Sequence, residues 1–345
     1  MAEPHMIPVD DLLARVTSIF ESCGVRPESA AAVARVIVAG ERDHCKSHGI
    51  YRIEGCLRVI AAGKVVPDAV PALRDTGRAV IEVNANGGFS NPAFYAAKDA
   101  LVARAKETGL AALVIRDCLH FSALWHDVEA LAEEGLASLS MCPSYSSVAP
   151  TGGKEPLLGT NPIAFGWPRP GPHPYVFDFA TSVAARGEIE LHRRAGTPIP
   201  EGWAMDRDGH PTTDPEAALA GAMLPFGGHK GSAISTMVEL LAGAMLGEFM
   251  SKEALEFSGG TSLLPRHGAL VLALDPATFA AQSGRDPIAE GERLLSAIGA
   301  QGARLPSQRR FAAREASLRD GITLSEAELA QLARFEAEGL AAVAG

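Results

Sequence analysis

The fold class is decided by a short apolar stretch, Leu110-Ala-Ala-Leu-Val-Ile-Arg116. An apolar run of this length, bounded by a glycine and by charged residues, is typical of a strand buried on both faces. Helices are expected on either side, over 90–109 and 124–134, and another strand is expected over 136–141. Strand and helix therefore alternate here, and this predicts an α/β fold.

A helical N-terminal region is expected before this stretch. Apolar residues recur at helical spacing over 9–23 and 50–62, and Pro27 can open a helix that runs toward His44. Further strands are expected over 78–83, 175–179 and 268–274, and further helices over 184–194, 233–246, 287–298 and 324–343. The segments 152–168 and 197–215 are rich in loop-forming residues.

The composition excludes several classes of protein. The net charge of −10 argues against a general nucleic-acid binder, although a few local cations could still hold a small anion. No apolar run of about 18 residues occurs, so no membrane span is expected, and residues 1–8 do not form a signal peptide. The five cysteines are odd in number and contain no Cys-x-x-Cys pair, which predicts reduced thiols and a cytoplasmic location.

Chemistry-bearing residues gather at the junction between two expected helices, over residues 42–52. His48 can transfer a proton near neutral pH, and Arg52 is placed to share a face with it and clamp a carboxylate. Together they describe a site for a 2-oxo or 2-imino acid, although a solvated turn would also explain them. The spacing of His44 and His48 could suit a metal ion, but no further ligands complete such a site, so none is expected.

Two other segments could bind phosphate groups. Phe226-Gly-Gly-His-Lys-Gly-Ser232 is a glycine-rich loop that opens a helix, where N–H groups can meet an anion; a tight structural turn is the alternative. Arg304-Leu-Pro-Ser-Gln-Arg-Arg310 is cationic and is either a solvated loop or a phosphate clamp. Neither a Walker motif nor a Gly-x-Gly-x-x-Gly fingerprint occurs. Asp178 could bind a hydroxyl or cap the turn that follows it.

Six sequence blocks occur in one order along nearly the whole chain, and together they resemble the malate/L-lactate dehydrogenase-type family of NAD(P)-dependent oxidoreductases. The blocks are Ser47-His-Gly-x-x-Arg52, His120-Phe-Ser-Ala-Leu124, Gly159-Thr-Asn-Pro-Ile-Ala-Phe165, Val176-Phe-Asp-Phe-Ala-Thr-Ser182, Thr212-Thr-Asp-Pro215 and Leu224-Pro-Phe-Gly-Gly-His-Lys-Gly231. The resemblance implies a non-Rossmann NAD(P)-binding fold and a homodimer.

Within this family, residues 120–129 and 304–310 resemble the Δ1-piperideine-2-carboxylate/Δ1-pyrroline-2-carboxylate reductases. This resemblance implies reduction of cyclic imino acids to L-pipecolate and L-proline with NADPH, with NADH as a weaker possibility. The first alternative is a 2-oxo acid (malate or lactate type) dehydrogenase, or an N-methyl-amino-acid dehydrogenase, in the same fold. The second is a non-catalytic nucleotide-binding protein.

The resemblance also implies roles for individual residues. His48 would be the proton donor, Ser47 would orient it, and Glu188 would raise its pKa as the third member of a relay. The implied substrate contacts are Arg52, Thr160, Arg186 and Gly187. The implied cofactor contacts are His120, Phe121, Ser122, Ala123, Leu124, Asp178, Phe179, Ala180, His229, Lys230, Arg304, Leu305, Pro306, Ser307, Gln308, Arg309 and Arg310, with Arg309 and Arg310 favoured for the 2′-phosphate. His120 stays a lesser catalytic candidate.

Three parts are expected along the chain. Residues 1–115 form a helical region for substrate binding and dimerisation, residues 116–299 form the NADPH-binding domain, and residues 300–345 form a cationic loop and helix that packs back on the first part.

Overall fold

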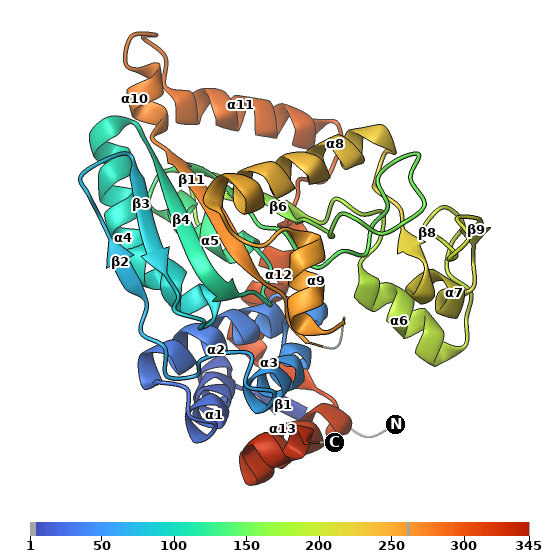
Figure 1. Ribbon diagram of the computed structural model, residues 1–345. Coiled ribbons are helices and arrows are strands. Elements are labelled where there is room, and N and C mark those ends of the chain that lie inside the picture. Colours follow the sequence, from blue (N-terminus) through green and yellow to red (C-terminus); the bar gives the residue numbers. More distant parts are fainter. Residues whose placement is uncertain (1–4, 261–262, 345) are drawn as a thin grey trace.

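The computed structural model describes residues 5–260 and 263–344, and it is built around a mixed sheet of seven strands (Figure 1). In sheet order these are β2 Ala72–Arg74, β3 Val80–Asn84, β4 Leu110–Leu119, β11 Arg266–Leu274, β5 Ala137–Met141, β6 Ile163–Trp167 and β7 Tyr175–Phe179. Only β3 and β4 pair in parallel, and the other neighbours in this sheet are antiparallel. The predicted α/β class is confirmed, as a mixed sheet with helices.

Both faces of this sheet are covered by helices. On one face, α4 Ser90–Thr108 and α5 Trp125–Glu133 form a core with Leu113 and Ile115. On the other face, α8 His229–Val238 and the turns that follow it pack on Val114. Successive side chains of β4 thus enter opposite cores, as expected for a strand buried on both faces.

The N-terminal helices form a separate core with the C-terminal end of the chain (Figure 1). Its elements are α1 Val9–Ser22, α2 Pro27–Arg42, α3 Tyr51–Ala61, α13 Glu326–Glu338 and the 3₁₀ turn η4 Gly339–Val343. The 3₁₀ turn η1 Lys46–His48 connects α2 to α3 and has no buried residue. A two-stranded sheet joins β1 His5–Ile7 to β12 Ile322–Leu324. The C-terminal segment therefore lies against the N-terminal helices.

The remaining elements lie outside the cores on the two faces of the sheet and outside the N-terminal core. A small lobe contains α6 Arg186–Ala195, α7 Pro215–Ala220 and the strands β8 Ala204–Met205, β9 Pro211–Thr212 and β10 Ala222–Met223. The other helices are α9 Ser251–Ser258, α10 Pro276–Ala280, α11 Pro287–Ala300 and α12 Gln308–Asp320. The predicted domain boundary between 115 and 116 falls inside β4, and the three-part division stays a prediction.

The elements that differ from the sequence expectation include the helix expected over 233–246, β6 and α12. The helix expected over 233–246 begins at His229 and ends at Val238, followed by the π turn η2 Glu239–Gly243 and the 3₁₀ turn η3 Ala244–Leu246. β6 lies in a segment expected to be loop; its Gly166 is required because a Cβ there would lie 2.4 Å from the Val128 carbonyl oxygen. α12 was missed because its sequence is mostly charged and has little apolar periodicity.

No single helix in the described ranges has the length and apolar character to cross a membrane; the bent pair formed by residues 229–246 and 251–258 meets that test jointly, by length and composition alone.

Candidate active site

Ser47, His48 and Arg52 lie together where η1 leads into α3. His48 and Arg52 share a face, as their spacing predicts. The Arg52 Nη2 lies 3.4 Å from His48 Nε2, and the Arg52 Nε donates to the Ser47 carbonyl oxygen (2.6 Å). A guanidinium can only donate, so Nε2 accepts, and Nδ1 then carries the proton and donates to Ser47 Oγ (3.1 Å). Arg52 therefore fixes the tautomer of His48, and the hydrogen bond to Ser47 holds the orientation of the ring.

Two residues that the sequence analysis missed hold this turn against α2. The buried Glu41 accepts a hydrogen bond from the Ile50 N–H (3.0 Å) and forms an ion pair with Lys46. Gly40 allows the close approach, because a Cβ there would lie 2.4 Å from the His48 carbonyl oxygen. Neither residue carries a motif, so only the folded packing identifies them.

In the described chain Glu188 is not among the groups that shift the pKa of His48, so its role in the relay stays a prediction. Burial, reinforced by the nearby Arg52, lowers the pKa of His48 to about 3. Glu188 is exposed in the first turn of α6. No group in the described ranges raises the pKa of His48, and a substrate carboxylate beside Arg52 would favour its charged form.

The segment 120–124 follows β4 and is mostly buried. The pKa of His120 is lowered by burial and by His267, His48 and Arg52, so His120 lies within electrostatic range of the candidate proton donor. The Phe121 ring packs on Phe89, with centroids 5.8 Å apart. The side chains of Ser122, Ala123 and Leu124 are buried or half-buried, and Ser122 Oγ accepts from Asn91. Any contact of this segment with a cofactor therefore falls mainly to its backbone.

Asp178 acts as a cap for α5. Its carboxylate accepts the Trp125 N–H (2.9 Å), and burial raises its pKa to about 6, against hydrogen bonds from the Trp125 and Leu124 backbone that lower it. The cap thus belongs to α5 and not to the turn after β7. The neighbouring Phe179 is exposed and Ala180 is half-exposed, so both stay accessible to a ligand.

Thr160 is held by a buried polar network centred on Glu239. The Thr160 carbonyl oxygen accepts hydrogen bonds from the backbone and hydroxyl of Thr181 (2.8 and 3.0 Å). The next residue, Asn161, has a φ of 32° and donates to Glu239 Oε1 (2.7 Å). Glu239 also accepts from the Ser251 N–H (3.0 Å). No sequence motif marks Glu239. In the structure it lies in a π turn, a feature frequent at functional sites.

Replacing Glu239 with glutamine is expected to destabilise the protein by about 1–3 kcal/mol and to raise the KM for the substrate. The amide would place a donor against donors and leave buried groups unsatisfied, which disturbs the backbone that carries Thr160. Chemical denaturation and steady-state kinetics measure the two effects. Glu256→Gln, at an exposed position of α9, is the control. A Glu239→Gln protein with unchanged stability and KM would contradict the assigned role.

Four further predicted residues lie on α8 and α6. His229 and Lys230 are exposed in the first turn of α8, and the close approach of Gly231 to the Phe226 carbonyl oxygen forms the tight turn before it. Arg186 donates to the Leu219 carbonyl oxygen (3.4 Å), and Gly187 is exposed beside it.

Arg310 is wrongly assigned to the cofactor. It is 7% exposed and forms ion pairs with Asp43 and Glu129, and its guanidinium stacks on Trp125 (3.9 Å to the ring centroid). A paired and buried guanidinium is not free for a phosphate.

Some of the other residues of the 304–310 loop are held by contacts within the protein, and others are exposed and could bind a ligand. Leu305 is buried, and its N–H is accepted by the Gln308 side chain. Ser307 Oγ donates to the Val176 carbonyl oxygen, which ties the loop to β7, while Pro306 is exposed. Arg304 and Arg309 are exposed, and neither makes a hydrogen bond or an ion pair in the described part of the chain. These two cations are the ones left for an anion.

Comparison with known proteins gives the family. The sequence pattern of the malate/L-lactate dehydrogenase family matches residues 7–333. The chain belongs to the malate/L-lactate dehydrogenase family. It is 62% identical to the Δ1-pyrroline-2-carboxylate reductase of Agrobacterium fabrum, over 99% of this chain and 100% of that one.

A second relative of this chain and a solved structure carry related names. The Δ1-pyrroline-2-carboxylate/Δ1-piperideine-2-carboxylate reductase of Pseudomonas aeruginosa is 55% identical, over 86% of this chain and 89% of that one. The crystal structure of Δ1-piperideine-2-carboxylate reductase from Pseudomonas syringae superposes with a TM-score of 0.92 at 42% identity, over 96% of this chain and 99% of that one. The predicted resemblance to this branch is confirmed.

Proposed function

We propose that this protein reduces the C=N bond of cyclic 2-imino acids, converting Δ1-piperideine-2-carboxylate to L-pipecolate and Δ1-pyrroline-2-carboxylate to L-proline. The observation that carries the proposal is the contact between His48 and Arg52, in a chain 62% identical to a Δ1-pyrroline-2-carboxylate reductase. A proton donor beside a carboxylate clamp suits a substrate with nitrogen and carboxylate on the same carbon.

In this proposal the substrate carboxylate binds Arg52. Without substrate, burial and Arg52 keep His48 neutral by lowering its pKa. A bound carboxylate would neutralise the charge of Arg52, which removes one of these causes and favours a proton on His48. His48 then donates that proton to the ring nitrogen, while Ser47 keeps the ring in place. Thr160 adds a substrate contact, and Glu188, Arg186 and Gly187 stay proposed members of the site.

We propose NADPH as the cofactor, with NADH weaker. When bound, the cofactor supplies the hydride that reaches C2 of the substrate. The residues fit such a group, because Arg304 and Arg309 are exposed, unpaired cations and α8 presents an N-terminus with His229 and Lys230. We further propose that this site is not a Rossmann site, since the sheet is mainly antiparallel and the chain has no Gly-x-Gly-x-x-Gly.

Replacing Arg309 with alanine is expected to raise the KM for NADPH roughly tenfold and to leave the KM for NADH nearly unchanged, because only NADPH carries the 2′-phosphate. Arg304→Ala tests the second cation in the same way. Arg293→Ala, an exposed arginine on α11, is the matched control. Equal effects on NADPH and NADH would contradict a 2′-phosphate contact.

Steady-state kinetics test the reaction. The kcat/KM for the two cyclic imino acids is expected to exceed that for pyruvate and oxaloacetate, and that for a 2-oxo acid supplied with methylamine. Equal or better turnover of pyruvate or oxaloacetate would favour a malate- or lactate-type dehydrogenase. Efficient formation of N-methyl-amino acids would favour an N-methyl-amino-acid dehydrogenase. Nucleotide binding with no turnover of any of these would favour a non-catalytic protein.

We also propose a cytoplasmic homodimer with the site completed near the subunit contact. Several large apolar side chains are exposed on α6 and on α8 with its following turns, namely Leu191, Met237, Leu240 and Met245. An apolar face of this kind supports burial against a second copy. All five cysteines are free, which agrees with a reducing compartment. The predicted division assigns the dimer contact and substrate site to 1–115 and the nucleotide site to 116–299, whereas these exposed side chains lie in 116–299, so we propose that the dimer contact extends to that part.

A further inference from the structure

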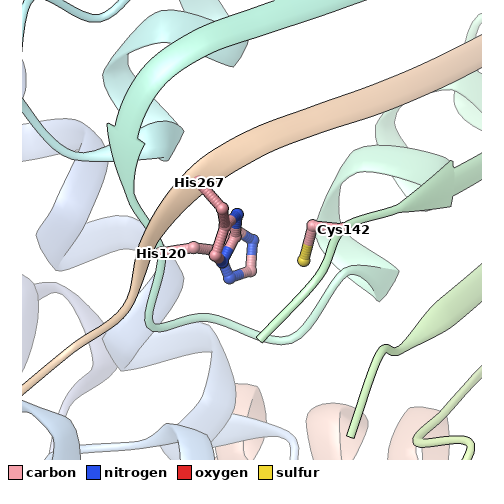
Figure 2. A group of neighbouring side chains, drawn as sticks. All are labelled: His120, Cys142 and His267. Carbon is pink, nitrogen blue, oxygen red and sulfur yellow. The ribbon is translucent and has the colours of Figure 1, made fainter. Parts of the chain in front are cut away.

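Two imidazoles and a thiol converge at one end of the central sheet (Figure 2). His120 follows β4, His267 lies at the start of β11, and Cys142 follows β5. β4, β11 and β5 are neighbours in the sheet, so residues far apart in sequence meet at the same edge. The register of β11 on β4 shifts between His267 and Ala269, and such a bulge re-aims side chains.

The three side chains are buried and offer unoccupied lone pairs. One donor atom from each lies within 4.8 Å of the other two. The His120 ring and the Cys142 thiol form no hydrogen bond in the described ranges. His267 Nδ1 lies 2.8 Å from the Gly268 carbonyl oxygen, to which it donates, and this leaves Nε2 as a lone pair. An outer-shell carbonyl of this kind orients histidine ligands in metal sites.

The three side chains can take the protonation states that a metal ion requires of its ligands. Burial lowers the pKa values of His120 and His267, so both rings are neutral near pH 7 and able to coordinate. The pKa of the Cys142 thiol is raised by burial and by nearby groups that include Asp127 and Asp178. Bound metal would release the thiol proton, and the thiolate would offset one unit of the divalent charge.

We propose that this protein binds one Zn²⁺ through His120, Cys142 and His267. Imidazole and thiolate are the ligands that Zn²⁺ prefers, and Mg²⁺ does not take such a set. From Zn–N and Zn–S bond lengths, tetrahedral ligand atoms lie about 3.5 Å apart, so small side-chain rotations close the site. Spacing along the sequence gave no sign of it, because each ligand follows or begins a different strand.

The position of the site predicts a consequence for activity. His120 lies within electrostatic range of His48 and Arg52, so bound Zn²⁺ adds positive charge beside the proton donor and disfavours its protonated form. Turnover is therefore expected to fall as the site fills. This consequence rests on the reductase function proposed above, whereas zinc binding is measured without substrate and is tested even if that function is wrong.

The test uses the full-length protein, stripped with a chelator, incubated with ZnCl₂ and freed of excess metal. Mass spectrometry of metal content is expected to give one zinc per chain, with release of a proton on binding and no retention of Mg²⁺. Cys142→Ala and His267→Asn are expected to lose the zinc and the proton release. Cys23→Ala, a buried thiol in the N-terminal core, is the control and keeps both.

Two results would overturn the proposal. One is a wild-type protein that retains no zinc. The other is a folded Cys142→Ala protein, verified by circular dichroism, with the zinc content of the wild type. If Cys142→Ala does not fold, Cys142→Ser and His120→Asn replace it, and unchanged zinc content in either folded variant counts equally against the site.

Discussion

Replacing His48 with alanine is expected to lower kcat for Δ1-pyrroline-2-carboxylate by roughly 10²–10⁴-fold, the usual effect of removing a general acid. The Nε2 of His48 contacts Arg52, so this is the ring nitrogen that would meet a substrate whose carboxylate is held by the guanidinium. The change removes the proton donor but leaves Arg52, so KM is expected to change much less than kcat. Steady-state kinetics with NADPH separate the two parameters.

His44 provides a matched control for this experiment. It lies four residues before His48 on the same connection, is exposed, and has a φ of 58° that asparagine tolerates. His44→Asn is therefore expected to keep the wild-type kcat. Ser47→Ala should cause a smaller loss than His48→Ala, because it removes only the group that orients the ring. An unchanged kcat in His48→Ala would show that another residue donates the proton, with His120 the first candidate to test.

Local patterns identified most of the framework. The apolar stretch at 110–116 predicted a strand covered on both faces, and its alternating side chains do enter two cores. The four-residue spacing of His48 and Arg52 predicted their contact, because the chain between them bends as a helix start. Such features depend on a few neighbouring residues, so the sequence displays them directly.

Pairings between distant residues could not be predicted. Arg310 stands in a cationic run, yet the fold buries it against Asp43 and Glu129, which lie more than 180 residues earlier. Glu239 has no motif, and its role depends on Asn161 being brought to it by the sheet. Charge in a sequence thus marks an available group only when no opposite charge lies close in the fold.

The buried charge cluster around Asp43 gives the second large expected effect. Asp43 is 2% exposed and pairs with Arg42, Arg310 and Arg314 at 2.6–3.0 Å. Asp43→Asn would leave the buried guanidinium of Arg310 with one carboxylate fewer, and breaking a buried pair costs about 3–5 kcal/mol. Urea denaturation is expected to show this loss in the free energy of unfolding. Asp320→Asn, in an exposed pair with Arg319, should change it little.

The ionisation of Asp43 also determines how its contribution to the free energy of unfolding depends on pH. Burial alone would raise the pKa of Asp43, but hydrogen bonds from Arg314 and Arg42 outweigh it and lower the pKa below its ordinary value. Its contribution is therefore fully present above the unfolded pKa of about 3.9 and is lost as pH falls through the folded value. The difference in unfolding free energy between wild type and Asp43→Asn should stay constant from pH 7 to about pH 5 and shrink below pH 4. A difference that instead grew on acidification would show that Asp43 is stabilised by its protonated form, contrary to the ion pairs seen here.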